Sequence, residues 1–378
     1  MCKGPPVAGP ASRGRTIHNC GRGKREIRQP SGGVRPGENA PARLTRGYER
    51  LSLTPPYWGG RAKTDMKCAF VFPGQGSQAV GMGRDLAEAF PSARLIFEEV
   101  DDALKQKLSR LMFEGPEDEL RLTENAQPAL MAVSMAVVAV LERECGVVLA
   151  DKAAFVAGHS LGEYSALAAS GALRLDDAAR LLKLRGQAMQ KAVPVGEGAM
   201  AALLGLDLEA AQAVAKEASA VGVCDCANDN APGQIVVSGA KAAVEKAVAI
   251  AAERGGKRSI MLPVSAPFHC ALMKPAADVM EEALAATAIE GPLVPLVANV
   301  SADSVEDPQQ IRRGLVEQVT AMVRWRESVL FMKGQDVDTL IETGAGKVLS
   351  GLARRIDREL ATKSLQSPAD FDDFVKQL

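Results

Sequence analysis

The sequence predicts an α/β fold, because strand-like apolar runs alternate with helical patterns from residue 66 onward. Three segments carry this prediction. Residues 153–157 form an apolar strand that breaks at Gly-x-Ser-x-Gly and runs into a helical pattern over 161–170. Residues 67–72 form another apolar strand, followed by a glycine-rich loop. Residues 198–263 alternate in the order strand, helix, strand, strand, helix, strand.

The turn at residues 158–162 has the layout of a nucleophile elbow, in which a sharp strand-to-helix turn holds a serine hydroxyl clear of the sheet. Ser160 is therefore the candidate nucleophile. Gly158 and Gly162 fit this interpretation, because the turn crowds the backbone where a Cβ atom would collide. The same motif also occurs in loops, and its position between a strand and a helix is what favours the elbow.

Composition divides the chain into two parts. Its 378 residues are 47% hydrophobic, which allows a large core and about two domains. Residues 1–65, however, contain 13 Lys or Arg, 4 Asp or Glu and 19 Gly or Pro, so we expect a basic, disordered extension there. An organelle transit peptide is one explanation. We favour an upstream extension with the natural start at Met66.

Cysteine and histidine content argues against a metal site. The seven cysteines show no pairing rhythm, which indicates free thiols in a reducing compartment. Three histidines in the whole chain cannot complete a site around Cys224 and Cys226. The longest apolar run, residues 129–141, is too short to span a bilayer and predicts a buried helix. We therefore expect no metal, no membrane and no nucleic acid as partners.

The remaining elements follow from apolar periodicity. Helices are predicted at residues 84–100, 101–113, 125–145, 175–192, 274–287 and 309–332, and strands at 294–300 and 339–342. Residues 198–263 have the strand and helix order of a ferredoxin-like unit. Because this unit lies between two chemically notable residues, Arg185 and His269, we expect it to close over a substrate cleft.

Two glycine-rich loops imitate nucleotide-binding motifs. Gly74, Gly76 and Ala79 follow a strand as in a dinucleotide fingerprint, but no acidic residue follows at the tip of a second strand. We favour a role for this loop as a source of backbone N–H donors. The turn at residues 344–347 is not predicted to be a phosphate loop, because Ile341 and Val348 stand where that motif needs Gly and Ser or Thr.

Arg185 lies within the apolar stripe of the predicted helix 175–192. A guanidinium there is unfavourable unless an anion meets it. The anion is either a structural partner such as Glu163 or the carboxylate of a bound substrate.

His269 is the candidate base for Ser160. A serine nucleophile needs a base within hydrogen-bond reach, and the adjacent His159 would point away across the turn. Residues 254–268 contain no Asp or Glu, so we expect a dyad in which a backbone carbonyl orients the imidazole. The N–H of Leu161 and one from the loop 74–76 would form the oxyanion hole.

Together these motifs closely resemble the malonyl-CoA:acyl-carrier-protein transacylase family of bacterial type II fatty acid synthesis. The likeness covers about residues 66–360 in order. It is carried by residues 70–78 (FVFPGQGSQ), 158–163 (GHSLGE), the helix with Arg185, 266–269 (APFH) and 344–349 (GAGKVL). The resemblance implies an α/β-hydrolase-like catalytic domain over 66–194 and 265–365 and a ferredoxin-like subdomain over 195–264. Residues 366–378 are then expected to form a C-terminal tail.

The resemblance also implies residue roles. In that family the residue matching Ser160 carries the malonyl ester, the residue matching Arg185 holds the malonate carboxylate, and the residue matching His269 is the base. The position of Gln318 matches the residue whose backbone carbonyl orients the histidine. Further matches are Gln75 as an oxyanion donor and Gln127 and His159 as pocket residues.

The expected function is ping-pong transfer of malonyl from malonyl-CoA to the phosphopantetheine thiol of acyl carrier protein, for fatty acid synthesis. No cofactor is expected, and the enzyme would be a cytoplasmic monomer, or organellar if residues 1–65 are a transit peptide. Two rivals remain open. A serine esterase shares the elbow but would show an acidic third partner and no buried arginine. A non-catalytic docking subunit for a carrier protein would not need the pair Ser160 and His269.

Overall fold

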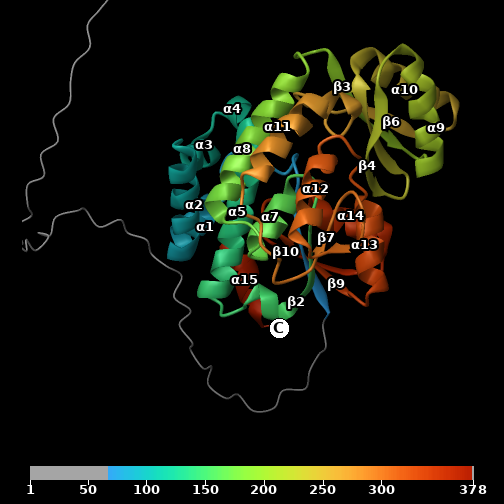
Figure 1. Ribbon diagram of the computed structural model, residues 1–378. Helices are drawn as coiled ribbons and strands as arrows, with labels where there is room; N and C mark the ends of the chain where they lie inside the picture. Colours follow the sequence, from blue (N-terminus) through green and yellow to red (C-terminus); the bar gives the residue numbers. More distant parts are fainter. Residues whose placement is uncertain (1–66, 377–378) are drawn as a thin grey trace, which may run out of the picture. The chain divides into compact units, whose positions relative to one another are not determined.

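The structure, a computed structural model, describes residues 67–376. It confirms the predicted α/β class, because these residues form one mostly parallel sheet and one separate antiparallel sheet (Figure 1). The expectations for residues 1–65 lie outside the described residues.

The larger sheet is built from strands far apart in the chain. In chain order they are β1 (Cys68–Phe72), β2 (Ala153–Gly158), β7 (Leu296–Val297), β8 (Ser304–Val305), β9 (Thr339–Thr343) and β10 (Ala361–Leu365). Their order in space is β10-β9-β1-β2-β7-β8, and every neighbouring pair is parallel except β7 and β8. The elbow strand β2 therefore lies beside β1, and their carboxyl ends meet at one edge of the sheet.

Helices cover both faces of this sheet. They are α1 (Arg84–Ala89), α2 (Pro91–Leu104), α3 (Leu108–Glu114), α4 (Glu117–Arg121), α5 (Thr123–Arg143), α6 (Leu149–Lys152), α7 (Gly162–Ala169), α8 (Leu175–Ala192), α11 (Lys274–Ala285), α12 (Pro308–Gln318), α13 (Trp325–Gly334), α14 (Val348–Ile356) and α15 (Pro368–Val375). A short 3-10 turn, η2 (Ala271–Met273), precedes α11. Phe70 and Phe72 of β1 belong to the core cluster that includes buried residues of α2, α5, α7 and α8, and Ala69 and Val71 belong to the cluster that includes α13 and α14. Burial on both faces explains why β1 is a continuous apolar run.

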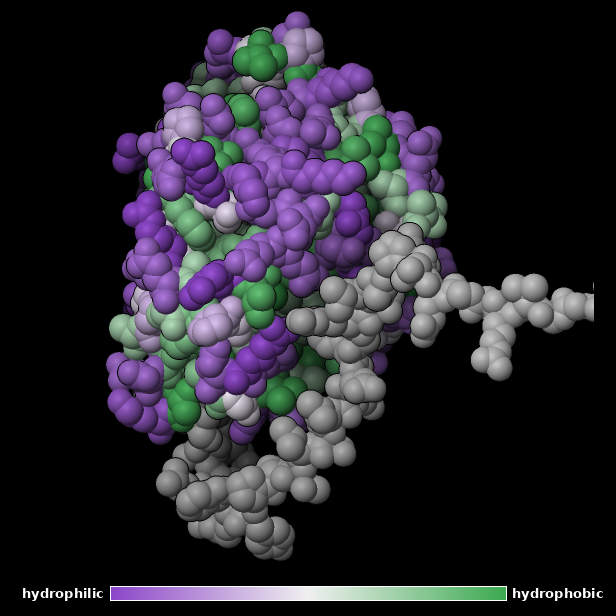
Figure 2. Space-filling model, turned by 90° about the vertical axis from the view of Figure 1, so that its left-hand side faces the viewer, coloured by the Kyte–Doolittle hydropathy of each residue, from purple (hydrophilic) through white to green (hydrophobic). Residues whose placement is uncertain are grey.

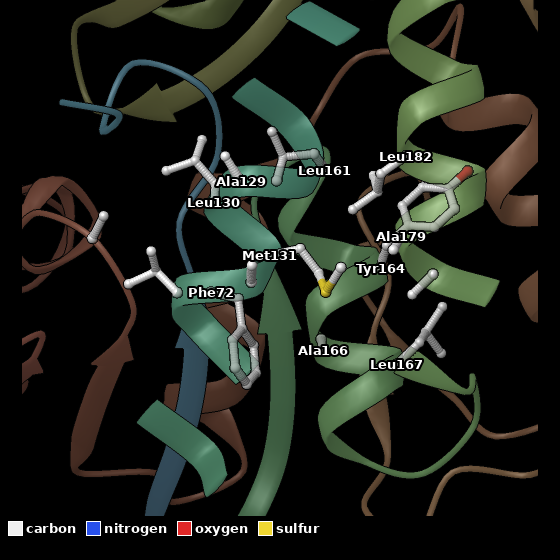
Figure 3. Packing of buried hydrophobic residues seen from close by; sticks show 14 of the residues in the cluster. Phe72, Ala129, Leu130, Met131, Leu161, Tyr164, Ala166, Leu167, Ala179 and Leu182 are labelled. Carbon is white, nitrogen blue, oxygen red and sulfur yellow. The ribbon is translucent and has the colours of Figure 1, made fainter. Parts of the chain in front are cut away.

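Helix α5 runs through the larger core. It is long and apolar enough to cross a membrane by length and composition, but 89% of its most apolar window is buried inside the protein. Figure 3 shows Leu130 and Met131 of this helix packed among Phe72, Tyr164 and Leu167. The prediction of a buried helix over residues 129–141 is confirmed. Hydrophilic side chains cover most of the face shown in Figure 2.

The smaller sheet has the predicted ferredoxin-like order. Its elements are β3 (Gly198–Leu204), α9 (Leu208–Ala218), η1 (Ser219–Val221), β4 (Cys224–Ala231), β5 (Gln234–Ala240), α10 (Lys241–Glu253) and β6 (Arg258–Met261). The strands lie in the order β4-β5-β3-β6, all antiparallel. Ala201 and Leu203 of β3 face α9 and α10, whereas Met200 and Ala202 face the larger core. The small sheet is thus packed on both faces.

Several expectations were wrong in detail. The helices predicted over 84–100 and 101–113 are three helices, because the chain is extended at Phe90 and α2 continues to Leu104 before α3 begins. The helix predicted over 309–332 is two helices, because Val323 leaves the helical path and pairs with the small sheet, donating its N–H to Ala227 O and accepting from Asp229 N. The strand predicted over 294–300 is only the two-residue β7, because the backbone N–H of Ala298 donates to the carbonyl oxygen of Asp303 in the turn that follows. The expected C-terminal tail contains α15, which packs Phe371 against Phe90.

Candidate active site

The nucleophile elbow forms as predicted. β2 ends at Gly158 and α7 begins at Gly162, and between them Ser160 has a φ of 54°. This left-handed conformation is unfavourable for a residue with a side chain and is typical of functional sites. A Cβ on Gly158 would lie 1.9 Å from the Gly162 carbonyl oxygen, and one on Gly162 would lie 2.3 Å from the Phe72 carbonyl oxygen. Only glycine therefore fits at either position.

His269 lies in reach of the serine. Its Nε2 is 2.7 Å from Ser160 Oγ, and its Nδ1 is 2.8 Å from the backbone carbonyl oxygen of Gln318. Because a carbonyl only accepts, Nδ1 carries the proton and Nε2 is left to accept from the serine. The expected arrangement of a dyad oriented by a backbone carbonyl is present. Burial, and then the nearby charge of Arg185, lower the pKa of His269 to about 3, so the imidazole is neutral at neutral pH.

Arg185 is fully buried on α8 and reaches the same serine. Its guanidinium donates to Gln127 Oε1 at 2.8 Å, to Gln318 Oε1 at 2.9 Å and to Ser160 Oγ at 3.2 Å. No carboxylate within residues 67–376 lies within ion-pair distance of it, so Glu163 is not a direct partner. Its Nε has no hydrogen-bond partner among the described residues. The guanidinium can therefore still accept an anion.

His159 faces the small sheet. Its Nε2 lies 2.8 Å from Asn230 Oδ1 of β4, and its ring packs near Trp325 with centroids 5.7 Å apart. As predicted, it points away from the serine chemistry, and it lines the cavity beside it. It therefore links the elbow to the small sheet.

These residues line one cavity of about 420 Å³. The larger core contributes Gln75, Gln127, Ser160, Leu161, Arg185 and His269, and the small sheet contributes Met200, Asn228, Asn230, Gln234 and Val236. The side chain of Gln75 accepts from Thr123 Oγ1 at 2.6 Å. Its loop packs tightly on the elbow, since a Cβ on Gly74 would lie 2.7 Å from His159 O. This arrangement suits a backbone donor at Gln75, with Leu161 at the start of α7 as the second.

Known proteins share both the sequence and this structure. Residues 69–364 match the family described as acyl transferase domain. The malonyl CoA-acyl carrier protein transacylase of Bacillus subtilis is 48% identical over 315 residues, which are 82% of this chain and 97% of that protein. The chain belongs to the malonyl CoA-acyl carrier protein transacylase family.

Solved structures agree with this assignment. The crystal structure of the acyl-carrier-protein-S-malonyltransferase of Bartonella henselae is 54% identical and superposes with a TM-score of 0.81, over 82% of this chain and 99% of that one. A malonyl-transacylase in complex with its type II polyketide synthase acyl-carrier protein is 42% identical, with a TM-score of 0.80 over 82% and 100% of the two chains. The family match over residues 69–364 contains both sheets and all predicted site residues.

Sequence reasoning missed Asn299, a buried residue that braces the elbow of this transacylase-family chain. Its Oδ1 accepts from Ser160 N at 2.8 Å, and its Nδ2 donates to Gly158 O at 2.6 Å. Its backbone N donates to Glu163 Oε2 at 3.0 Å. The available signal was its position just after β7, because polar residues at the carboxyl ends of parallel strands gather at one edge of the sheet.

The turn before α14 already contains an anion. Glu342, at the end of β9, is buried and accepts the N–H groups of Leu349 at 2.9 Å and Ser350 at 2.8 Å. A helix N-terminus attracts negative charge, and here a side chain of the chain itself supplies it. This explains why the glycine-rich turn with Lys347 need not bind a phosphate.

Proposed function

We propose that this chain transfers malonyl from malonyl-CoA to the phosphopantetheine thiol of acyl carrier protein through a malonyl ester on Ser160. One observation carries the proposal: Ser160 Oγ lies within reach of both a base, His269 Nε2 at 2.7 Å, and the guanidinium of Arg185 at 3.2 Å, which has no direct ion pair within residues 67–376. A thioester carbonyl on the serine would place the malonyl carboxylate next to the guanidinium.

The first half-reaction forms the ester. His269 Nε2 accepts the proton as Ser160 Oγ attacks the thioester carbonyl carbon of malonyl-CoA. The oxyanion accepts from the N–H groups of Gln75 and Leu161, each of which contributes about 3 to 4 kcal/mol in comparable sites. The C–S bond then breaks, and the imidazolium returns its proton to the leaving CoA sulfur.

The second half-reaction runs the same steps in reverse. The thiol of the phosphopantetheine arm gives its proton to His269 and attacks the ester carbonyl. The C–O bond to Ser160 breaks, and the serine oxygen takes the proton back from the imidazolium. No cofactor takes part, because one serine and two thiols exchange a single acyl group.

Arg185 selects the acyl group. A planar guanidinium grips a carboxylate through two parallel hydrogen bonds, and burial strengthens that interaction. Gln127 and Gln318 hold the guanidinium from behind. An acetyl group has no carboxylate for the guanidinium of Arg185 to bind. The guanidinium therefore holds a malonyl group in place but not an acetyl group.

The remaining assignments follow from this role. Acyl carrier protein is the second substrate, since the malonyl-transacylase relative was solved with one. All proposed catalytic groups come from one chain, so a monomer would suffice for the reaction. Residues 195–264 act as a subdomain that closes the cavity over the catalytic domain at 66–194 and 265–365.

An assay of transfer against hydrolysis tests the proposal. Purified enzyme with malonyl-CoA and phosphopantetheinylated carrier protein should form malonyl carrier protein much faster than free malonate. Hydrolysis that outruns transfer would indicate an esterase. Absence of both activities would indicate a docking subunit.

A further inference from the structure

Two buried charged side chains lie at this site without a direct ion pair. Arg185 and Glu163 are each 1% exposed. Within residues 67–376 neither has an oppositely charged side chain at 4.0 Å or less. An isolated buried charge is strongly unfavourable, so each needs another means of compensation.

The side-chain amide of Gln318 joins the two. Its Oε1 accepts from Arg185 at 2.9 Å, and its Nε2 donates to Glu163 Oε2 at 2.9 Å. The oxygen end of the amide dipole thus faces the cation and the nitrogen end faces the anion. Only this orientation satisfies both charges.

The same residue touches the catalytic pair. Gln318 Nε2 also lies 3.0 Å from Ser160 O, and its backbone carbonyl orients His269 at 2.8 Å. Glu163 in turn accepts from the backbone N of Asn299, which braces Ser160. A change of charge at Glu163 therefore alters the electrostatic environment of Arg185, where the acyl carboxylate binds.

We infer that Glu163 is the internal counter-ion of Arg185, held to it through the Gln318 amide, and that binding of an acyl carboxylate to Arg185 is coupled to protonation of Glu163. This rests on the proposed function. The substrate carboxylate takes the place of Glu163 as the anion that neutralises the guanidinium. Two anions cannot share one cation in a buried site without one taking up a proton, which here comes from the buffer.

The titration range of Glu163 suits this coupling. Burial raises its pKa to about 7, against the opposing effects of the Asn299 N–H, Gln318 and Arg185. The other ionisable groups of the site titrate outside this range: the pKa of Tyr164 on α7 is raised to about 12 and that of His269 is lowered to about 3. Burial also lowers the pKa of His159. The buried residues of α5 and the strand β2 contain no ionisable side chain.

Calorimetric binding to the full chain with Ser160→Ala tests the inference, because this variant cannot be acylated. Titrations in buffers of different ionisation enthalpy measure proton uptake. When malonyl-CoA binds at pH 7.5, the protein should take up more than about half a proton. The affinity for malonyl-CoA should fall roughly tenfold from pH 6.5 to 8.5. Acetyl-CoA carries the same phosphates without the carboxylate, and it should show neither effect.

Two further variants locate the proton on the same Ser160→Ala background. Glu163→Gln should abolish the uptake and tighten malonyl-CoA binding at pH 8.5 about tenfold, while acetyl-CoA binding stays unchanged. Glu342→Gln removes another buried carboxylate that accepts backbone N–H groups, and it should keep the uptake of the parent.

The outcomes separate the two ideas. Preferential malonyl-CoA binding without proton uptake, or uptake that persists in Glu163→Gln, would overturn the inference and leave the proposed function standing. The titration of the parent decides the matter even if Glu163→Gln does not fold. Malonyl-CoA that binds no better than acetyl-CoA, together with no malonyl transfer by the native chain, would overturn the proposed function itself.

Discussion

The backbone carbonyl of Gln318 accepts a hydrogen bond of 2.8 Å from Nδ1 of His269. This contact fixes the tautomer and leaves Nε2 facing Ser160 Oγ. It uses a neutral acceptor where a triad would use a carboxylate. The hydrogen bond to this carbonyl raises the pKa of the imidazole, but burial and then the charge of Arg185 outweigh it and lower the pKa of His269 to about 3.

The reactivity of Ser160 should therefore not decrease near pH 6.5, where an ordinary histidine takes up a proton. His269 is active when neutral, which is above its pKa, so a lowered pKa extends activity toward acid. The rate at which a fluorophosphonate modifies Ser160 in the free enzyme should stay flat from pH 8 to pH 5. Replacement His269→Ala should slow this rate by roughly 10²-fold to 10⁴-fold. A half-loss of the parent rate at pH 6.5 would show that the imidazole titrates normally.

Selectivity for the acyl group should depend on Arg185. The variant Arg185→Ala should lose roughly 10- to 150-fold in kcat/KM for malonyl-CoA, the equivalent of about 1.5–3 kcal/mol for a charge-assisted hydrogen bond. Acetyl transfer should rise, because the buried guanidinium no longer faces an acyl group without a carboxylate. Steady-state rates with both thioesters measure this. Equal losses for the two would assign Arg185 a structural role.

Stability should depend on pH through Glu163. Its folded pKa of about 7 lies above the ordinary value of 4.5, so the folded state prefers the protonated form. The stabilisation is complete below pH 4.5 and is lost as the pH rises through 7. Glu163→Gln cannot ionise. Its unfolding free energy minus that of the parent should therefore increase by about 3 kcal/mol when the pH is raised from 5 to 8. Urea unfolding at the two pH values measures this, and a constant difference would contradict it.

Any side chain at Gly158 should destabilise the elbow by steric overlap. A Cβ there would overlap the Gly162 backbone at 1.9 Å, so Gly158→Ala should cost more than about 4 kcal/mol or prevent folding. Gly351 in the exposed face of α14 has nothing within 4 Å of such an atom. Gly351→Ala should stabilise by about 0.5–1 kcal/mol. Thermal unfolding of both variants checks this, and a well-folded Gly158→Ala protein would refute the crowding argument.

Local sequence signals were enough for β1, β2, the strands of the small sheet and the elbow, but they did not predict β8 or β10. Burial on both faces leaves an apolar run such as β1, and the elimination of His159 left only His269 for Ser160. The role of the Gln318 carbonyl came from the family resemblance, because any residue can supply a backbone carbonyl. Contacts between residues far apart in the chain produce no recognisable local pattern in the sequence. The break between α12 and α13 exists because Val323 pairs with β4, nearly a hundred residues earlier in the chain.

Asn299 shows the same limit at the site. It braces Ser160 from the turn after β7, a two-residue strand whose position is set by its neighbour β2 rather than by its own sequence. Glu163 is not a direct partner of Arg185, because the Gln318 side chain lies between them. An amide that joins two charges becomes visible only when three distant segments are placed together.

In the proposed reaction, Ser160 carries the malonyl group between two thiols. Peptide mass spectrometry after a short exposure to malonyl-CoA tests it most directly, followed by a chase with phosphopantetheinylated carrier protein. We expect a malonyl adduct on the peptide that contains Ser160, absent in Ser160→Ala, which disappears in the chase as malonyl carrier protein forms. An adduct on another residue, or one that leaves only as free malonate, would show that Ser160 does not carry the malonyl group to the carrier protein.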